Sequence, residues 1–227
     1  MQNPGLISKS GATQMKRAPI PVIGGAPPPR HGRCLDRGMS TRIVGAVALP
    51  GCSISVGLDG PQAIVRLQGR AAAESAPAFE KLIVRLQQQG ARCIVLDLSE
   101  ALLMDSGFSG TVSRLVGANG ASFAVYRAPQ RILDGLDDHG VLGQISVLTD
   151  EALDAPFPDT VEVPLDPVSK SEVLKCCLDA HRALMALKPE NVAKFEVLER
   201  FLSRESDKLQ AEASHSIDRD PAVGSGS

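Results

Sequence analysis

The sequence lacks several features that large classes of proteins require. It contains no tryptophan and a single tyrosine, Tyr126, so aromatic platforms for stacking nucleic-acid bases are scarce. Its formal net charge is −2 at pH 7, whereas a nucleic-acid-binding domain carries a strong basic surplus. No segment approaches the roughly 20 consecutive apolar residues of a membrane-spanning helix. We therefore expect neither nucleic acid nor a membrane as partner, which leaves proteins and small molecules.

The cysteines lack the spacing of a metal site or a disulfide framework. There are five, and none forms a C-x-x-C pair: Cys34, Cys52, Cys93, Cys176 and Cys177. Structural zinc sites take their cysteines from closely spaced pairs, and a disulfide framework takes an even number. We therefore expect reduced thiols in a cytoplasmic protein, with no metal site and no cofactor.

The two ends of the chain differ in composition from the segment between them. Residues 1–50 carry one acid, Asp36, against several lysines and arginines, and are rich in proline and glycine. Such a segment buries too little apolar surface to offset its ordering entropy. We expect a disordered basic arm over 1–50, in which Met39 is a possible true start, and a disordered tail over 211–227.

The folded part is predicted to begin with a β-hairpin. Two short apolar runs, 54–58 and 63–69, flank a turn that contains Asp59, Gly60 and Pro61. Residues of these types favour tight turns between strands.

Helical and strand-like patterns then alternate up to residue 155. The predicted elements are a helix within 73–90, a strand at 92–98, a helix at 108–117, a strand at 121–126, a helix at 130–140 and a strand at 144–148. The run 92–98 is apolar without alternation, as in a strand covered on both faces. We predict that 51–155 is an α/β domain with a mixed open sheet of about five strands and packed helices.

A helical extension is predicted after this domain. Residues 156–168 form a proline-rich linker, and SKSE at 169–172 has the form of a capping box. Pro189 suits the first turn of a second helix, so 169–210 is predicted to be a helical hairpin. Its apolar faces need a partner, which is the domain, the other helix, or a second copy in a homodimer.

The stretch MDSGFSGT at 104–111 connects the central strand to the second helix. Ser106 is a candidate N-cap, since its hydroxyl oxygen could accept a backbone hydrogen bond from the first helical turn. Helix N-termini also attract anions, and a phosphoserine here would add a charge of about −1.5 to −2 beside Asp105.

Residues 52–155 resemble the STAS domain, the family named for sulphate transporters and anti-sigma factor antagonists. The resemblance depends on the element order, on the sequence VLDLS at 95–99, and on Asp105-Ser106, which follow Asp97 by eight residues. In one branch of the family the motif reads Asp-Ser-Thr-Phe-Leu-Gly, and Phe108 and Gly110 lie in register with it. The segment 178–199 is similar to an extension that follows some bacterial members of that branch.

The resemblance implies a non-catalytic partner-switching module. In the family the unphosphorylated domain docks on an anti-sigma factor that is itself a serine kinase, and phosphorylation at this helix mouth breaks the docking. The resemblance thus predicts an anti-sigma-type kinase as partner. It also implies these partner-binding residues: Asp59, Asp97, Asp105, Ser106, Gly107, Phe108, Ser109 and Thr111.

The sequence departs from the family at the phosphoacceptor, because this position is occupied by Gly107, which has no hydroxyl group. Either phosphorylation has moved to Ser106 or Ser109, or the switch is lost. Two other functions remain open: a STAS scaffold or small-molecule-binding module in a sensory complex, and a serine hydrolase that uses Ser109 with His139 or His181 as base.

Overall fold

A computed structural model of the chain describes residues 51–118, 120–150, 159–163 and 167–217. The arm predicted over 1–50 and the end of the tail, 218–227, lie outside the described residues. The strands are β1 (Cys52–Asp59), β2 (Gln62–Ala71), β3 (Cys93–Asp97), β4 (Ala101–Met104), β5 (Ser122–Tyr126), β6 (Ser146–Leu148) and β7 (Val161–Glu162). The helices are α1 (Ala76–Gln88), α2 (Ser106–Gly117), α3 (Gln130–Asp138), the short 3-10 helix η1 (Val141–Gly143), α4 (Lys170–Leu187) and α5 (Pro189–Ile217).

The strands form one mixed sheet in the order β6-β5-β3-β2-β1-β7, with β4 pairing β2 as well. β1 and β2 make the predicted antiparallel hairpin around Gly60 and Pro61, and β2, β3, β5 and β6 are parallel. The parallel strands are joined by crossover connections that contain the helices, which is the usual way to link them. The predicted mixed sheet and α/β class are confirmed.

Two short strands were not predicted. β4 follows β3 after a three-residue break and pairs with the last residues of β2, where the register shifts between Gly69 and Arg70. β7 lies within the predicted linker and pairs antiparallel with the middle of β1. Both are too short to show a strand period in the sequence. Their pairing is also set by strands far away in the chain, which a local pattern does not reveal.

One apolar core lies between the sheet and the helices. Phe79 of α1 and Phe108 of α2 are fully buried, with ring centroids 4.7 Å apart. Ile132 of α3 and Leu184 of α4 belong to the same buried cluster as the inward residues of the sheet. A smaller cluster, which includes Ile64 and other side chains of the central strands, lies on the opposite face. The helices α1 to α4 thus share one face of the sheet.

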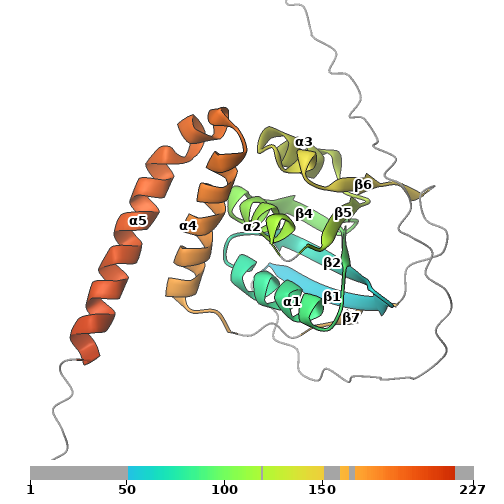
Figure 1. Ribbon diagram of the computed structural model, residues 1–227, viewed down its shortest axis with the longest axis horizontal. Coiled ribbons are helices and arrows are strands. Elements are labelled where there is room, and N and C mark those ends of the chain that lie inside the picture. Colours follow the sequence, from blue (N-terminus) through green and yellow to red (C-terminus); the bar gives the residue numbers. More distant parts are fainter. Residues whose placement is uncertain (1–50, 119, 151–158, 164–166, 218–227) are drawn as a thin grey trace, which may run out of the picture.

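The C-terminal helices form the predicted hairpin, with α4 lying between α2 and α5 (Figure 1). The capping box is confirmed: the Ser169 hydroxyl accepts from the Glu172 amide, and the Glu172 carboxylate accepts from the Ser169 amide. Lys188 separates the two helices, and α5 begins at Pro189 as predicted. The predicted end at residue 210 is wrong, because α5 continues to Ile217.

Candidate functional site

The candidate site is the start of α2, where the chain leaves β4. Asp105 is the N-cap of this helix: its backbone is extended, and its Oδ1 accepts a hydrogen bond of 2.8 Å from the Phe108 amide. The prediction that Ser106 caps the helix is wrong, because Ser106 is already the first helical residue. A carboxylate at the N-cap also suits the positive end of the helix dipole.

The second oxygen of Asp105 holds the neighbouring loop. Oδ2 accepts a hydrogen bond of 2.9 Å from the amide of Ala73, in the turn between β2 and α1. The Asp105 amide in turn donates to the carbonyl of Ala71, the last residue of β2. Asp105 therefore joins three parts of the domain, and its carboxylate has a structural role in this arrangement.

Ser106 contacts the C-terminal extension. Its hydroxyl lies 3.0 Å from Nε2 of His181 on α4, a residue with 2% of its surface exposed. The other ring nitrogen, Nδ1, lies 2.7 Å from the carbonyl oxygen of Cys177. Because a carbonyl only accepts, Nδ1 carries a proton in this contact, and with the ring in that tautomer Nε2 accepts from the Ser106 hydroxyl.

Two glycines allow close packing at the beginning of α2. A Cβ atom on Gly110 would lie 2.4 Å from the carbonyl oxygen of Ala180, so α2 and α4 approach each other backbone to backbone. A Cβ atom on Gly107 would lie 2.9 Å from the Cβ of Ala73. At this position, where the resemblance implies a phosphoacceptor, a serine would require the neighbouring turn at Ala73 to move.

The other predicted partner-binding residues of α2 are buried. Phe108 is part of the core, and Thr111 donates to the carbonyl of Gly107. Ser109 is 1% exposed, and its hydroxyl donates to the carbonyl of Asp105 at 2.8 Å rather than to a histidine. Between Ser106 and Val116 only Ser106, Arg114 and Val116 are half-buried and the other residues are buried, so most of α2 is covered in this arrangement.

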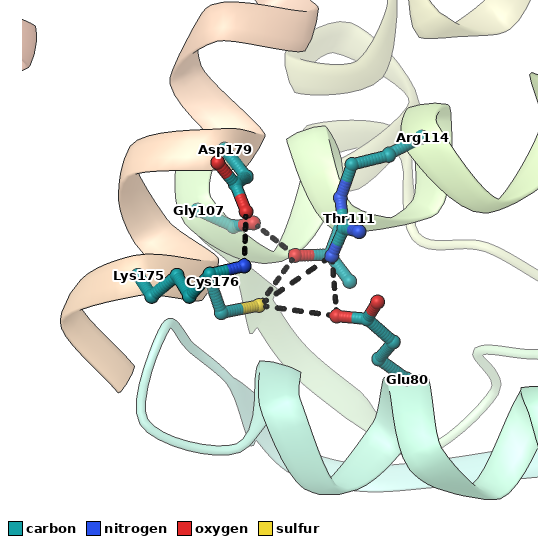
Figure 2. Close-up of polar contacts among 7 residues, drawn as sticks. All are labelled: Glu80, Gly107, Thr111, Arg114, Lys175, Cys176 and Asp179. Carbon is teal, nitrogen blue, oxygen red and sulfur yellow. Dashed lines mark hydrogen bonds and ion pairs between the residues drawn. The ribbon is translucent and has the colours of Figure 1, made fainter. Parts of the chain in front are cut away.

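A junction of α1, α2 and α4 borders the site (Figure 2). The thiol of Cys176 lies 3.4 Å from the Thr111 hydroxyl and 4.0 Å from the guanidinium of Arg114, which also forms an ion pair with Glu80 of α1. Burial raises the pKa of the Cys176 thiol, so it remains protonated at neutral pH. Beside this junction lies a cavity of about 290 Å³, whose walls include charged side chains of both signs.

Of the two other acids in the predicted partner-binding set, Asp59 lies elsewhere in the fold and Asp97 is already paired. Asp59 ends β1 and pairs with Gln62 at the start of β2, whereas Asp97 ends β3 and pairs in register with Arg66, in the middle of β2. Asp59 therefore lies at the opposite end of β2 from Asp105, whose amide bonds to Ala71, so the predicted partner-binding acids do not form one cluster. Asp97 is 2% exposed and bonds Arg66 at 2.8 Å, so its carboxylate is engaged within the fold.

The extension is also attached to α3 through a cluster of aromatic and polar side chains. The ring of Phe195 on α5 lies 5.0 Å from the ring of His181 and 5.7 Å from that of His139. Asn191 is fully buried and donates to the carbonyls of His139 and Leu184. His139 and His181 are thus packed residues of the α3–α4–α5 contact rather than solvated helix ends.

Sequence reasoning identifies this region but not its main contact. His181 enters it only as a possible base for Ser109, whereas the structure places it against Ser106, 75 residues away. No spacing in a linear sequence signals such a pair. A buried histidine on an amphipathic helix is a signal only once the helix has been placed in the fold.

Within the ranges that the structure describes, no group of three or more potential metal ligands occurs. The described cysteines, Cys52, Cys93, Cys176 and Cys177, are free thiols. None of the described helices is long and apolar enough to cross a membrane.

Among solved structures, the chain is similar to the anti-sigma factor antagonist SpoIIAA in its unphosphorylated form, with 17% identity over 43% of this chain and 90% of that chain and a TM-score of 0.38. It is similar to the phosphorylated form of the Bacillus cell fate determinant SpoIIAA, with 17% identity over 43% and 93% and a TM-score of 0.36. Protein TM1081 matches with 14% identity over 53% and 90% and a TM-score of 0.39.

No protein-family model and no curated protein matches the chain. The element order and the mixed sheet, followed by two C-terminal helices, agree with the α/β architecture predicted from the sequence.

Replacement of Asp105 by alanine is expected to lower the free energy of unfolding by about 1–3 kcal/mol, because the amides of Phe108 and Ala73 both lose their acceptor. Urea denaturation followed by circular dichroism measures this change. The matched control is Glu100→Ala, an exposed acid in the preceding loop, which should change stability by less than about 0.5 kcal/mol. Equal effects in the two variants would contradict the structural role of Asp105.

The contact between α3 and α5 is expected to weaken in acid. Burial lowers the pKa of His139 below its ordinary value of 6.5. Nearby positive charges lower this pKa further, whereas the negative charge of Asp138 raises it. The unfolded chain then binds this proton more readily than the folded one, so the free energy of unfolding should fall as the pH drops below about 6.5. His139→Phe keeps a ring against Phe195 without a titrating group, and should lose less stability between pH 7.5 and 5.5. An equal loss of stability in the wild type and in His139→Phe would show that protonation of His139 is not the cause.

Proposed function

We propose that the chain is a non-catalytic regulatory module that acts by protein–protein interaction in the manner of an anti-sigma factor antagonist. The observation that carries the proposal is the STAS-like fold combined with the position of the Asp105-Ser106 motif at the start of α2. We infer that its partner is an anti-sigma factor of the serine-kinase type, and that it regulates transcription in the bacterial cytoplasm through partner switching.

The proposed docking surface consists of the loop from 104 to 106 and helix α2. Met104, Asp105 and Ser106 are half-buried, and the adjacent Leu102 of β4 is 61% exposed. An exposed leucine beside a polar helix start gives the apolar centre and polar rim typical of protein interfaces. Asp59 lies too far away to belong to this surface, as the strand register requires.

The proposed switch, if one operates, uses Ser106. Gly107 carries no hydroxyl and has no room for one, and the Ser109 hydroxyl is buried and bonded within the helix. The Ser106 hydroxyl is half-buried and lies at the positive end of the helix dipole. A phosphate group there would place negative charge beside Asp105 at the centre of the docking surface.

Two other functions have weaker support. A scaffold or small-molecule-binding STAS module could use the cavity at the α1–α2–α4 junction, but its charged side chains already pair with one another, as in Lys81–Glu172 and Arg114–Glu80. A hydrolase that uses Ser109 would need a base beside it, and the Ser109 hydroxyl gives its hydrogen to a backbone carbonyl instead.

Affinity capture from native cells with the full-length chain as bait tests the proposed function. We expect the wild type to recover an anti-sigma-type serine kinase, and Ser106→Asp to recover at least tenfold less, because the added charge lies in the contact. Mass spectrometry measures the captured kinase and any phosphate on the 104–114 peptide of the bait.

The control for this experiment is Ser122→Asp, which adds the same charge to an exposed serine at the far end of β5. This variant should capture as much kinase as the wild type. Equal capture by all three baits would show that Ser106 lies outside the contact, and the absence of any such kinase would overturn the sigma-factor function.

We also propose that the chain forms a homodimer through α5. The outer side of this helix exposes Val197 and Phe201 at 67% and 58%, with Leu198 beside them. Residues 194, 198, 201 and 205 recur at spacings of 4, 3 and 4, as in a coiled-coil seam. Antiparallel pairing would place Leu198 opposite Phe201 of the second copy, so the apolar centre of this face is complementary to itself. Lys194 and Glu205, at its two ends, pair within the chain with Asp138 and Lys208.

Phe201→Glu is expected to raise the dissociation constant of the dimer at least tenfold, since it places charges at the centre of the seam. Sedimentation equilibrium measures this constant. Val192→Glu changes an exposed valine away from the seam and should leave the dimer intact. A wild-type protein that remains monomeric at about 100 μM, well above the Kd of a micromolar dimer, would refute the proposal.

A further inference from the structure

Helix α2 is covered by its neighbours over most of its surface in the described structure, although it is the helix through which the proposed partner would bind. Phe108 packs on α1, and Ser113 donates to Gln144 next to η1. The remaining side is covered by α4, which contacts α2 at Gly110. A partner can therefore reach the residues of α2 beneath α4 only if α4 moves.

The α4 side of α2 is composed of small and polar residues. Every α2 residue with a specific contact to α4 is of this kind: Ser106, Gly110, Thr111 and Arg114. The side of α2 that faces the core instead carries Phe108, Val112 and Leu115. Because apolar burial supplies most of the free energy of packing, these polar contacts contribute little of it, and α4 is held mainly by its own buried apolar residues, among them Cys176 and Leu184. The α2 residues of these polar contacts are also ones that tolerate water.

The polar groups of this contact are incompletely satisfied. The Nε of Arg114 is buried and has no hydrogen-bond partner among the described residues. The contact between the Thr111 hydroxyl and the Cys176 sulfur is a weak hydrogen bond. A permanently closed interface would be expected to pair such a donor, since an unpaired buried donor is costly.

We propose that α4 is a built-in competitor for the partner: α4 and α5 together move away from α2, and the exposed face of Ser106, Gly110, Thr111 and Arg114 then receives a helix of the partner. This inference rests on the proposed docking function and adds its regulation. The hydrogen bond from Ser106 to His181 is the polar contact that holds the closed state at the start of α2.

The closed contact also defines the kind of helix that would fit. Because Gly110 meets the backbone of Ala180, the partner helix must carry glycine, alanine or serine at the crossing point. An acceptor is required for the Ser106 hydroxyl, and a carboxylate would satisfy the free Nε of Arg114. We expect the partner to present a small residue and an acid on one helical face.

An engineered disulfide tests whether binding requires opening. Thr111→Cys places a second sulfur next to Cys176, since the Thr111 oxygen is 3.4 Å from that thiol, and oxidation would bond α2 to α4 in the full-length chain. The oxidised protein should capture at least tenfold less of the kinase than the same protein after reduction. Thr111→Cys combined with Cys176→Ser cannot form the bond and should show no effect of oxidation.

Hydrogen exchange measures the opening without any partner. Peptides from α2 and α4 should exchange faster than those from β3 and β5, which are exposed only by global unfolding. Ala180→Leu inserts a larger side chain at the Gly110 crossing, and should raise the exchange of α2 and α4 at least tenfold while the strands remain protected. Ala186→Leu, on the exposed side of α4, should have no such effect.

Two results would overturn the inference: exchange of α2 and α4 only together with β3 and β5 in every variant, or equal kinase capture by the oxidised and reduced proteins. These results are distinct from failure of the proposed function. If the reduced Thr111→Cys protein also recovers no anti-sigma-type kinase, the proposed docking function is wrong, and so is the proposal that α4 controls the access of that partner. The hydrogen-exchange experiment would still show whether α4 moves away from α2 without unfolding of the sheet.

Discussion

The backbone contact between Gly110 and Ala180 determines how the two parts of this chain fit together. It requires a glycine on α2 and an alanine on α4 at the same point, and it brings Ser106 within reach of His181 and Thr111 within reach of Cys176. Any larger residue at the crossing would separate the helices and remove these bonds. The α/β domain and the helical extension therefore behave as one folded unit when this contact is closed.

Most of the fold could be predicted from the sequence because its signals are local. The turn at Gly60 and Pro61, the capping box at Ser169 and the helix start at Pro189 each depend on residues that are adjacent in the chain. The short strands β4 and β7 could not be predicted in this way. Their pairing partners lie far away in the sequence, and a strand of two to four residues has no period to detect.

The candidate site was predictable in position but not in the roles of its side chains. Asp105, Ser106 and Ser109 were all recognised as polar residues at a helix mouth, yet which of them caps the helix depends on backbone angles. The burial of Ser109 and of Asp97 depends on neighbours that only the folded chain supplies. The role of His181 depends on the docking of a separate helix, which no residue pattern in 104–111 reveals.

The unequal lengths of the two C-terminal helices have a mechanical consequence. At a rise of about 1.5 Å per residue, the 29 residues of α5 extend about 43 Å, against about 27 Å for the 18 residues of α4. Because the helices are joined at Lys188, the far end of α5 projects beyond the start of α4 (Figure 1). A rotation of about 10° at this joint would displace that end by about 7 Å, as the helix length requires. The length of α5 would thus convert a small rotation at Lys188 into a larger displacement at the periphery of the molecule.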